Sequence, residues 1–361
     1  MADVPFVDLA AAHAEVADEI RAGFDRVLDT TAFVQGPDVG AFEREYAAFS
    51  GAGHCVGVAS GTDALELALR ALGCGPGREV VLPANTFVAT AEAVVRTGAR
   101  PVLVDVDPDH LLLEPRLLLS AIGPRTAAIV PVHLYGQLAP MAAIAAHGIP
   151  VVEDAAQSQG ASQDGRGLFG RLAATSFYPG KNLGAYGDAG AVLTDSADLA
   201  RAVRLLGDHG SEVKYRHETL GFNSRLDTLQ AVVLRAKLRR LTDWNGRRRV
   251  AAARYAALLD GLPDVTLPAE ATGNTHVWHL YVIRVPRRDE VARTLAEMGI
   301  RTGIHYPMPI HLQPAFRDLG HAPGDFPVTE TAATEILSLP MFPHITEEQQ
   351  DRVATALRKA L

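Results

Sequence analysis

The segment Ser176-Phe-Tyr-Pro-Gly-Lys-Asn182 decides how the rest of this chain is interpreted. It closes a short β-like run, residues 173–178, and places Lys181 in a tight turn bordered by glycine and proline. A lysine that forms a Schiff base must be held rigidly and must lose its proton, and a Pro-Gly turn meets these conditions better than a solvated helix face. Lys181 is therefore a candidate reactive amine, and a surface lysine in a polar loop is the alternative.

A second candidate group is the carboxylate at the end of the apolar run 149–157. The run has the pattern of a short buried strand with acids at its carboxyl end, where α/β folds place their chemistry. Asp154 could therefore face a ligand and keep a heterocyclic nitrogen protonated. A helix N-cap before Ala155 is the alternative.

Two further segments supply groups that a phosphorylated ring would need. Small residues at 59–62 precede an amphipathic helical pattern, so the amides of Gly61, Thr62 and Asp63 could hold a dianion at a helix N-terminus. The same residues also fit an ordinary N-cap. Phe87 follows the strand-like run 79–82 at a turn-to-helix junction, where it could stack on a planar ring or belong to the core.

These segments together match what a Schiff base of pyridoxal 5′-phosphate (PLP) requires. In this order they resemble the sugar aminotransferases of the DegT/DnrJ/StrS family, fold-type I PLP enzymes that aminate keto sugars carried on nucleotides. The resemblance runs nearly end to end, through SGTDAL (60–65), PANTFVAT (83–90), VDVD (104–107), PVHLYGQ (131–137), VEDAAQ (152–157), SFYPGKNLGAYGDAG (176–190), GFNSRLD (221–227) and HYPMPIHLQ (305–313). A dehydratase branch of the family has histidine in place of Lys181, so that branch is disfavoured.

The resemblance implies a role for each matching residue. Lys181 would bind PLP as an internal Schiff base, and Asp154 would pair with the pyridine nitrogen. Gln157 would bond the ring hydroxyl, and Phe87 would stack on the ring. Gly61, Thr62 and Ser176 would hold the phosphate, and Asn223 would reach it from a second subunit, which implies a homodimer with shared active sites.

The substrate residues are predicted from two loops and from the same resemblance. The loop 304–313 is stiffened by prolines and presents His305, Tyr306 and His311, whose spacing fits no common metal site. Two structural histidines are the alternative. The polar loop 209–217 could close over a diphosphate through Lys214 and Arg216, or could be a mobile surface loop. In the family, the counterparts of Tyr186, Lys214, Tyr215, His305 and Tyr306 lie near the nucleotide sugar.

The predicted reaction is a transamination from L-glutamate to a dTDP-linked keto-deoxysugar, at C3 rather than C4. The alternatives are a C4 keto-sugar aminotransferase of the same family, a cyclitol aminotransferase that uses glutamine, and a non-catalytic PLP-binding regulator. A dinucleotide-dependent dehydrogenase is disfavoured, because no GxGxxG follows the first strand-like run.

The fold prediction is α/β: a fold-type I aminotransferase with a mostly parallel seven-stranded sheet flanked by helices, and a small C-terminal α+β domain. Strand-like and helical runs alternate from about residue 54 to 205, which is typical of βαβ units. We predict a large PLP-binding domain over 1–240 and a small domain over 241–361. Helices are predicted at 227–241, 243–259 and 288–298, and strands at 277–285 and 300–304. The run Arg247-Arg-Arg249 reads as a solvated helix face.

Composition narrows the functional class only slightly. The 361 residues include 42 acidic and 34 basic side chains, and the formal charge of −8 argues against nucleic acid as a partner. Cys55 and Cys74 fit neither a disulfide framework nor a metal site. Residues 1–8 lack a signal-peptide pattern, and no apolar stretch approaches the ~20 residues that a membrane helix needs. We therefore expect a cytoplasmic protein without a membrane partner.

Overall fold

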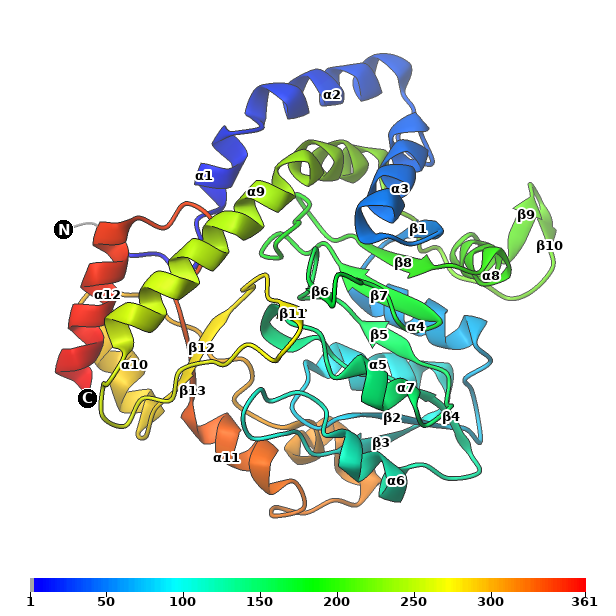
Figure 1. Ribbon diagram of the computed structural model, residues 1–361. Helices are drawn as coiled ribbons and strands as arrows, with labels where there is room; N and C mark the ends of the chain where they lie inside the picture. The colour runs from blue at the N-terminus through cyan, green and yellow to red at the C-terminus, as the bar shows by residue number, and fades with distance from the viewer. Residues whose placement is uncertain (1–2) are drawn as a thin grey trace.

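The centre of the molecule is one twisted sheet, seen in the computed structural model, which describes residues 3–361 (Figure 1). Met1 and Ala2, which begin both the predicted large domain and the segment compared with a signal peptide, lie outside the described residues. A three-stranded part, β3-β2-β4, joins a four-stranded part, β5-β7-β8-β1, through parallel bridges between Ile129 and Val151 and between Val132 and Asp154. The strands are β1 (His54–Val58), β2 (Glu79–Pro83), β3 (Arg100–Val104), β4 (Thr126–Ile129), β5 (Val152–Asp154), β7 (Leu172–Ser176) and β8 (Gly190–Thr194).

This arrangement confirms the predicted α/β architecture with a mostly parallel seven-stranded sheet. β8 is antiparallel to both of its neighbours, β7 and β1, and the other pairings in the sheet are parallel. The carboxyl ends of β5 and β7 therefore meet at the same edge, which is where α/β sheets bind ligands.

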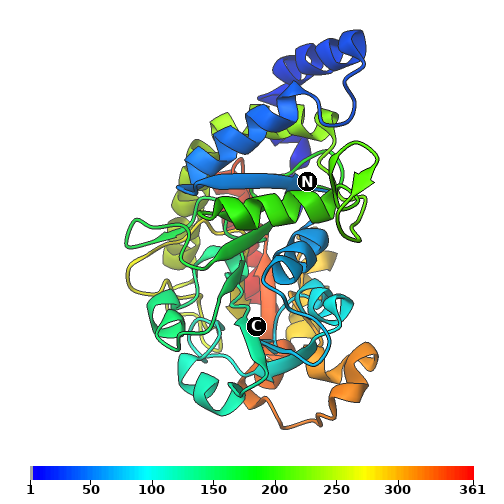
Figure 2. The ribbon, with the colours of Figure 1, turned by 90° about the vertical axis from the view of Figure 1, so that its right-hand side faces the viewer.

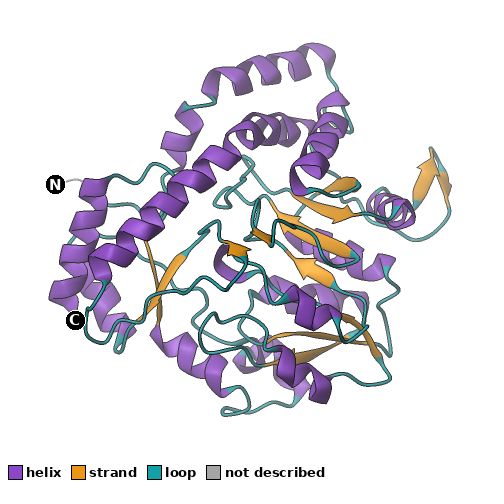
Figure 3. Ribbon diagram, in the orientation of Figure 1, coloured by secondary structure: helices purple, strands orange, loops and turns teal. Residues whose placement is uncertain are grey.

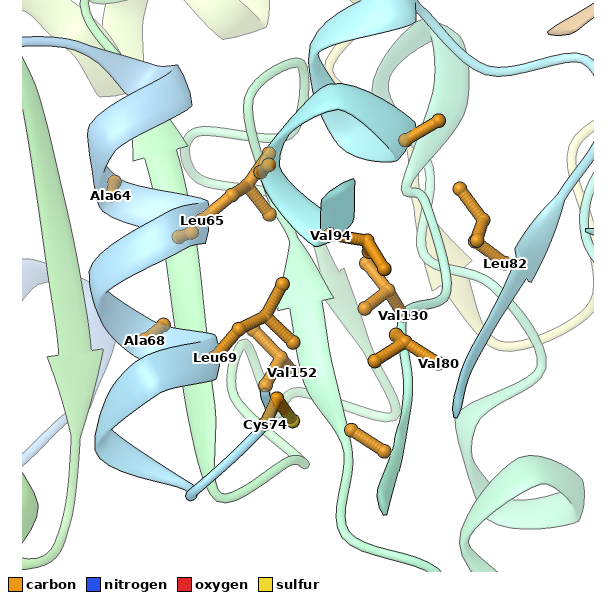
Figure 4. Packing of buried hydrophobic residues seen from close by; sticks show 14 of the residues in the cluster. Ala64, Leu65, Ala68, Leu69, Cys74, Val80, Leu82, Val94, Val130 and Val152 are labelled. Carbon is orange, nitrogen blue, oxygen red and sulfur yellow. The ribbon is translucent and has the colours of Figure 1, made fainter. Parts of the chain in front are cut away.

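Helices cover both faces of the sheet. α4 (Gly61–Ala71) and α5 (Val88–Thr97) lie on the opposite side of the strands from α6 (Leu118–Ala121) and α7 (Met141–Ala145) (Figure 2). Leu65 and Leu69 of α4 are buried in the core that contains Val94 of α5 and Val152 of β5 (Figure 4). Burial of each such leucine side chain contributes about 1.5–3 kcal/mol, so this packing holds the start of α4 firmly against the sheet.

The remaining helices of the first half surround this core. α3 (Pro37–Ser50) packs against β1 and the long helix α9, and α8 (Ala197–Gly207) packs against α4 and β1. α1 (Leu9–Ala14) and α2 (Ala17–Thr30) precede them, and α2 also contacts α9. Two small ribbons pair β6 (Ser162–Gln163) with β11 (Asn274–Thr275) and β9 (Ser211–Val213) with β10 (Arg216–His217).

Helix α9 (Thr228–Leu259) is a single 32-residue helix, so the prediction of two helices, 227–241 and 243–259, is wrong (Figure 1). The residues at the expected break, Thr242 and Asp243, include neither proline nor glycine, and Trp244 and Asn245 are buried against the rest of the fold. Burial of these side chains thus stabilises the helix across a segment whose own helix preference is weak. The predicted boundary between the two domains, at residue 240, falls inside this helix. The division into two domains at that residue stays a prediction.

Arg248 corrects the prediction of a solvated face at 247–249. Its side chain is buried, and its guanidinium donates to the carbonyl oxygens of Trp278 (3.1 Å) and Met341 (3.0 Å). Burial lowers the pKa of Arg248 to about 9. Arg247 by contrast forms an ion pair with Glu15 at 2.7 Å. One turn of α9 therefore ties together the C-terminal part of the chain and the helix α1 region.

The C-terminal part is a small α+β unit, as predicted, but its strands differ in detail. β12 (Tyr281–Arg284) is shorter than the predicted 277–285, because Trp278 adopts a left-handed backbone (φ 47°) that interrupts the extended run. The predicted strand 300–304 forms only isolated bridges, from Ile300 to Val4 and from Gly303 to Ser338. β12 pairs instead with β13 (Ile336–Leu339), which was not predicted. The helices are α10 (Arg288–Glu297), α11 (Pro327–Glu335) and α12 (Glu347–Ala360).

Over residues 3–361, no helix is both long and apolar enough to cross a membrane. The same residues contain no group of three or more His, Cys, Asp and Glu side chains that could hold a metal ion. Cys55 and Cys74 are both buried free thiols.

Candidate active site

A cavity of about 470 Å³ opens at the carboxyl edge of the sheet. It is bounded by the start of α4, the start of α5, the ends of β5 and β7, and the loops that carry Lys181 and His305. Most of the predicted residues line it, namely Gly61, Thr62, Phe87, Asp154, Gln157, Ser176, Lys181, His305 and Tyr306. Residues far apart in the sequence are thus brought to one site.

The start of α4 forms one end of the cavity. Ser60 caps the helix by accepting a hydrogen bond from the amide of Asp63 at 3.1 Å, so the alternative reading as an N-cap is also correct. A Cβ atom at Gly61 would lie 2.5 Å from the Cβ of Ser176. Only glycine therefore lets the helix start approach the end of β7, and this brings the Ser176 hydroxyl beside the free amides of the first turn.

Lys181 lies in the turn that its sequence predicts. Its amide donates to the carbonyl of Tyr178 at 2.9 Å, and a Cβ atom at Gly184 would lie 2.3 Å from the carbonyl oxygen of Pro179. The Nζ of Lys181 forms no hydrogen bond or ion pair with any residue in the range 3–361. Burial lowers the pKa of Lys181 to about 8, against the opposing charge of Asp154. The amine is therefore free to react and close to losing its proton at neutral pH.

Asp154 is held by two donors at the end of β5. The Thr90 hydroxyl donates to Oδ2 at 2.7 Å, and the amide of Ala156 donates to Oδ1 at 3.2 Å. Burial raises the pKa of Asp154, while the two hydrogen bonds and the charge of Lys181 act in the opposite direction. The Thr90 hydroxyl is itself hydrogen-bonded to Thr86 at 2.8 Å. The carboxylate thus closes a local turn and lines the cavity at the same time.

Gln157 and Tyr306 form a hydrogen-bonded pair across the cavity wall. Gln157 accepts from the amide of Tyr135 at 2.6 Å and donates to the Tyr306 hydroxyl at 3.1 Å. Burial raises the pKa of Tyr306, so its hydroxyl keeps its proton. Phe87 packs on the Tyr306 ring at a centroid distance of 5.1 Å, and half of its surface stays exposed. The alternative that Phe87 belongs to the core is therefore wrong.

The two histidines of the 304–313 loop have different surroundings. His305 lines the cavity, bonds Ser338 through Nδ1 at 2.8 Å and stacks on Phe6. Burial lowers the pKa of His305 to about 4, so it is neutral at physiological pH. His311 is buried against Glu330 at 2.9 Å, away from the cavity, which agrees with a structural role.

Four of the residues that the family resemblance places at the site do not line this cavity. Tyr186 lies over the amine of Lys237, whose Nζ is 4.5 Å from the ring centroid. Asn223 is exposed and pairs with Asp208. Lys214 and Tyr215 belong to the β9–β10 hairpin, which stands away from the sheet (Figure 3), and 84% of Tyr215 is exposed. The structure does not bring them to the cavity of their own chain.

Sequence reasoning missed several residues of the cavity. Phe6 and Val7 reach it from the N-terminal segment, and His279 reaches it from the loop before β12. His279 could have been found in the sequence as a polar side chain inside the apolar run 277–285. Phe6 and Val7 are apolar, so nothing in their chemistry indicates a site.

The comparison with known proteins follows the same residues. The family model described as the DegT/DnrJ/EryC1/StrS aminotransferase family matches residues 14–358. The chain belongs to this family. It is therefore a PLP-dependent aminotransferase.

Individual relatives in the DegT/DnrJ/EryC1/StrS family cover nearly the whole chain. The erythromycin biosynthesis sensory transduction protein EryC1 of Saccharopolyspora erythraea is 50% identical over 99% of both chains. The dTDP-3-amino-3,4,6-trideoxy-alpha-D-glucose transaminase of Streptomyces venezuelae is 49% identical over 99% of this chain and 96% of its own. The crystal structure of S. venezuelae DesV in complex with a ketimine intermediate superposes with a TM-score of 0.97 at 49% identity, over 99% of this chain and 98% of that one.

The groups in the cavity fit the cofactor that DegT/DnrJ/EryC1/StrS aminotransferases use. Lys181 offers an amine without a hydrogen-bond partner among residues 3–361, and Asp154 offers a buried carboxylate. The backbone amides of the first turn of α4, together with Ser176, offer a phosphate-binding site that needs no basic side chain. Each chemical part of PLP thus has a matching group.

Proposed function

We propose that this aminotransferase moves the amino group of L-glutamate to C3 of a dTDP-linked 3-keto-6-deoxyhexose, in deoxyamino sugar biosynthesis of the kind that serves antibiotic production. The cavity carries the transaminase part of this proposal, because a free amine and a buried carboxylate face the same space. The sugar and the carbon are supported by the 49% identical S. venezuelae relative, whose name specifies a dTDP-3-amino sugar.

The residues of the cavity would divide the work of holding the cofactor. Lys181 would bind it covalently, and Asp154 would face the ring nitrogen. Gln157 would bond the ring hydroxyl and Phe87 would cover the ring. Gly61, Thr62 and Ser176 would hold the phosphate. When bound, PLP supplies an electron sink for the electrons that a substrate carbon keeps when it loses a proton.

The chemistry of the chain itself is proton transfer at Lys181. Once released from the cofactor, the Nζ amine can take the proton from the α-carbon of glutamate, because burial keeps its pKa near 8. The Thr90 hydroxyl hydrogen-bonds the Asp154 carboxylate that would face the ring nitrogen, and this bond opposes the burial that raises the pKa of Asp154. The same amine would return a proton in the sugar half of the reaction.

The four predicted residues that lie outside the cavity support a shared active site. Asn223 and the hairpin residues Lys214 and Tyr215 are exposed in one chain, and Val213 and Leu220 beside them expose 60% and 94% of their surfaces. Exposed apolar and aromatic groups on a projecting hairpin are suited to contact with a second copy. We therefore propose a homodimer in which these residues complete the site of the partner, with Tyr186 at the boundary.

Mixing two inactive variants tests the shared site. Lys181→Ala removes the amine, and Asn223→Asp places a negative charge against the phosphate of the neighbouring site. If Asn223 acts across the interface, equal mixing after subunit exchange should restore about one quarter of the wild-type activity, because half of the dimers then hold one intact site. Light scattering checks the oligomeric state, and a fully active monomer would contradict the proposal.

A second prediction separates the sugar site from the donor site. Lys214→Ala should raise the KM for the dTDP sugar about 10–100-fold, the loss expected for one charge-assisted phosphate contact, and should spare the glutamate half-reaction. Lys359→Ala, an exposed lysine on α12, is the matched control. Equal slowing of both half-reactions by Lys214→Ala would argue against a role at the diphosphate.

Product analysis tests the reaction itself. We expect the C3-aminated sugar when the enzyme is incubated with dTDP-3-keto and dTDP-4-keto sugars and glutamate, with the products read by mass spectrometry. Free keto sugars or keto acids that react equally well would overturn the nucleotide-sugar assignment. Turnover with a C4 ketone or with glutamine and a cyclitol would instead support the other aminotransferase alternatives.

A regulatory alternative follows from the name of the EryC1 relative, a sensory transduction protein. The intact Lys181, Asp154 and Gln157 favour turnover, and conversion of glutamate to 2-oxoglutarate by the purified protein would decide between an enzyme and a regulator.

The two free buried thiols are compatible with a reducing compartment, and the cytoplasm remains our proposed location.

A further inference from the structure

A buried hydroxyl joins the two ends of the segment 59–63, which contains the start of α4. The Oγ of Ser224 accepts a hydrogen bond from the amide of Ala59 at 3.2 Å and donates one to the Oδ2 of Asp63 at 2.9 Å. Because a backbone N–H only donates and a carboxylate only accepts, the single proton of the hydroxyl must point toward Asp63. The backbone amide of Ser224 donates to the carbonyl of Gly207 at 2.8 Å, and only 3% of the residue is exposed. The hydroxyl is thus a fixed point that holds both ends of the segment.

The residues between these two ends form one wall of the cavity. Ser60, Gly61 and Thr62 line it, whereas Asp63 and Ser224 do not. The hydroxyl of Ser60 is occupied as the cap of the helix, where it accepts from the amide of Asp63 at 3.1 Å. The amides of Gly61 and Thr62 have no hydrogen-bond partner among residues 3–361. Two free donors therefore sit on a short segment whose ends are held from outside the cavity.

The same hydroxyl helps to determine where the charge of Asp63 lies. A carboxylate that faced the cavity at this point would repel a phosphate group bound to the neighbouring amides. Instead, its Oδ1 is 3.6 Å from the guanidinium of Arg96, and its Oδ2 accepts from Ser224. Arg96 is shared, because it also forms an ion pair with Glu66 at 2.7 Å. The bond to Ser224 is therefore the shorter of the two contacts that keep this acid outside the cavity.

We propose that Ser224 is a positioning residue for the phosphate of PLP. By holding Ala59 and Asp63, it fixes the loop whose amides at Gly61 and Thr62 would bind the phosphate, although it does not line the cavity itself. This inference rests on the proposed role of the loop as the phosphate-binding site. An alanine at position 224 would make neither hydrogen bond, so the loop and the carboxylate would both be free to move.

Pyridoxal, which lacks the phosphate, separates this role from a general effect on the fold. The cofactor-free protein is titrated with PLP and with pyridoxal, and binding is followed by the absorbance of the Schiff base. We expect Ser224→Ala to raise the Kd of PLP about 10-fold, the cost of about one hydrogen bond, and to change the Kd of pyridoxal by less than about 2-fold. Melting curves identify a variant that has lost its fold.

A matched pair at Asp63 tests the same hydrogen bond from the loop side, without a change next to Asn223. Asp63→Asn and Asp63→Ala both remove the charge, but only asparagine keeps an oxygen that can accept from Ser224. The alanine variant should therefore bind PLP about 3–10-fold more weakly than the asparagine variant. Ser196→Ala is the control, because it removes a hydroxyl that caps α8 away from the cavity, and it should change neither Kd.

Three results would overturn the proposal: an unchanged PLP affinity in Ser224→Ala, an equal loss for PLP and pyridoxal, or equal PLP affinities in the two Asp63 variants. Ser176→Ala tests the phosphate-binding site itself, because this hydroxyl lines the cavity. A loss selective for PLP in Ser176→Ala, without one in Ser224→Ala, would overturn the role of Ser224 alone. A selective loss in neither variant would overturn the phosphate-binding site, and the role of Ser224 with it.

Discussion

Lys181→Ala is expected to abolish both the glutamate and the sugar half-reactions, with a loss of at least about 10³-fold in single-turnover rate. General acid–base catalysis by one side chain contributes about 10²–10⁴-fold, and this variant also loses the covalent attachment of the cofactor. Among residues 3–361, no other lysine lines the cavity. Rapid-mixing absorbance measurements on each half-reaction would give the two rates separately.

The attachment point can be located chemically, because the chain contains only four lysines, at 181, 214, 237 and 359. Borohydride reduction followed by peptide mass spectrometry should place the cofactor on the peptide that contains Lys181. Lys237 is the most informative competitor, because burial also lowers its pKa to about 8. Its amine donates to the carbonyl of Gly184 at 2.7 Å, so we expect it to remain unlabelled. If the cofactor were found on the peptide with Lys237, the assignment of Lys181 as the residue that binds the cofactor would be wrong.

Asp154→Asn is expected to lower turnover by roughly 10²–10³-fold while most of the cofactor stays bound. Removal of one preorganised electrostatic group from a catalytic site has a cost of this size. The asparagine has nearly the same shape as the aspartate and keeps an acceptor for Thr90, but it cannot hold a proton on the ring nitrogen. Occupancy should change little, since the phosphate seat and Lys181 are untouched. Steady-state rates and absorbance of the bound cofactor measure the two quantities.

A matched aspartate provides the control for this experiment. Asp195 accepts a hydrogen bond from the amide of Gly53 at 2.8 Å, away from the cavity, so Asp195→Asn should change stability only slightly and leave turnover intact. If Asp154→Asn lost cofactor and turnover to the same extent, or kept its turnover, Asp154 would be a structural turn residue only.

Local sequence patterns were sufficient for the residues whose neighbours are close in the chain. The Pro-Gly turn identifies Lys181, the apolar run identifies Asp154, and the small residues before α4 identify Gly61, because each pattern reflects backbone geometry within a few residues. The Gln157–Tyr306 and Asn182–His279 contacts could not be predicted in this way. They join segments more than ninety residues apart, whose relative positions depend on the packing of the whole core.

The errors in secondary structure have the same origin. β13 was not predicted, and α9 is continuous, because pairing with β12 and burial of Trp244 outweigh the weak preferences of the local sequence. The hairpin residues Lys214 and Tyr215 show most clearly what a local sequence pattern cannot predict. Their chemistry suggested a ligand, but no local sequence pattern shows that the folded chain places them away from its own cavity.

The pairing of β8 with β1 and the bridge from Val4 to Ile300 have a consequence for how the chain acquires its fold during synthesis. β1 leaves the ribosome long before β8. The backbone groups of β1 therefore stay unpaired while the residues between the two strands are synthesised. Val4 waits longer still, until the last quarter of the protein has appeared. Closing such long loops is slow, and it exposes apolar strands in the meantime. A chain that stops before the C-terminal unit would therefore leave both its N-terminal segment and one wall of the cavity without a partner.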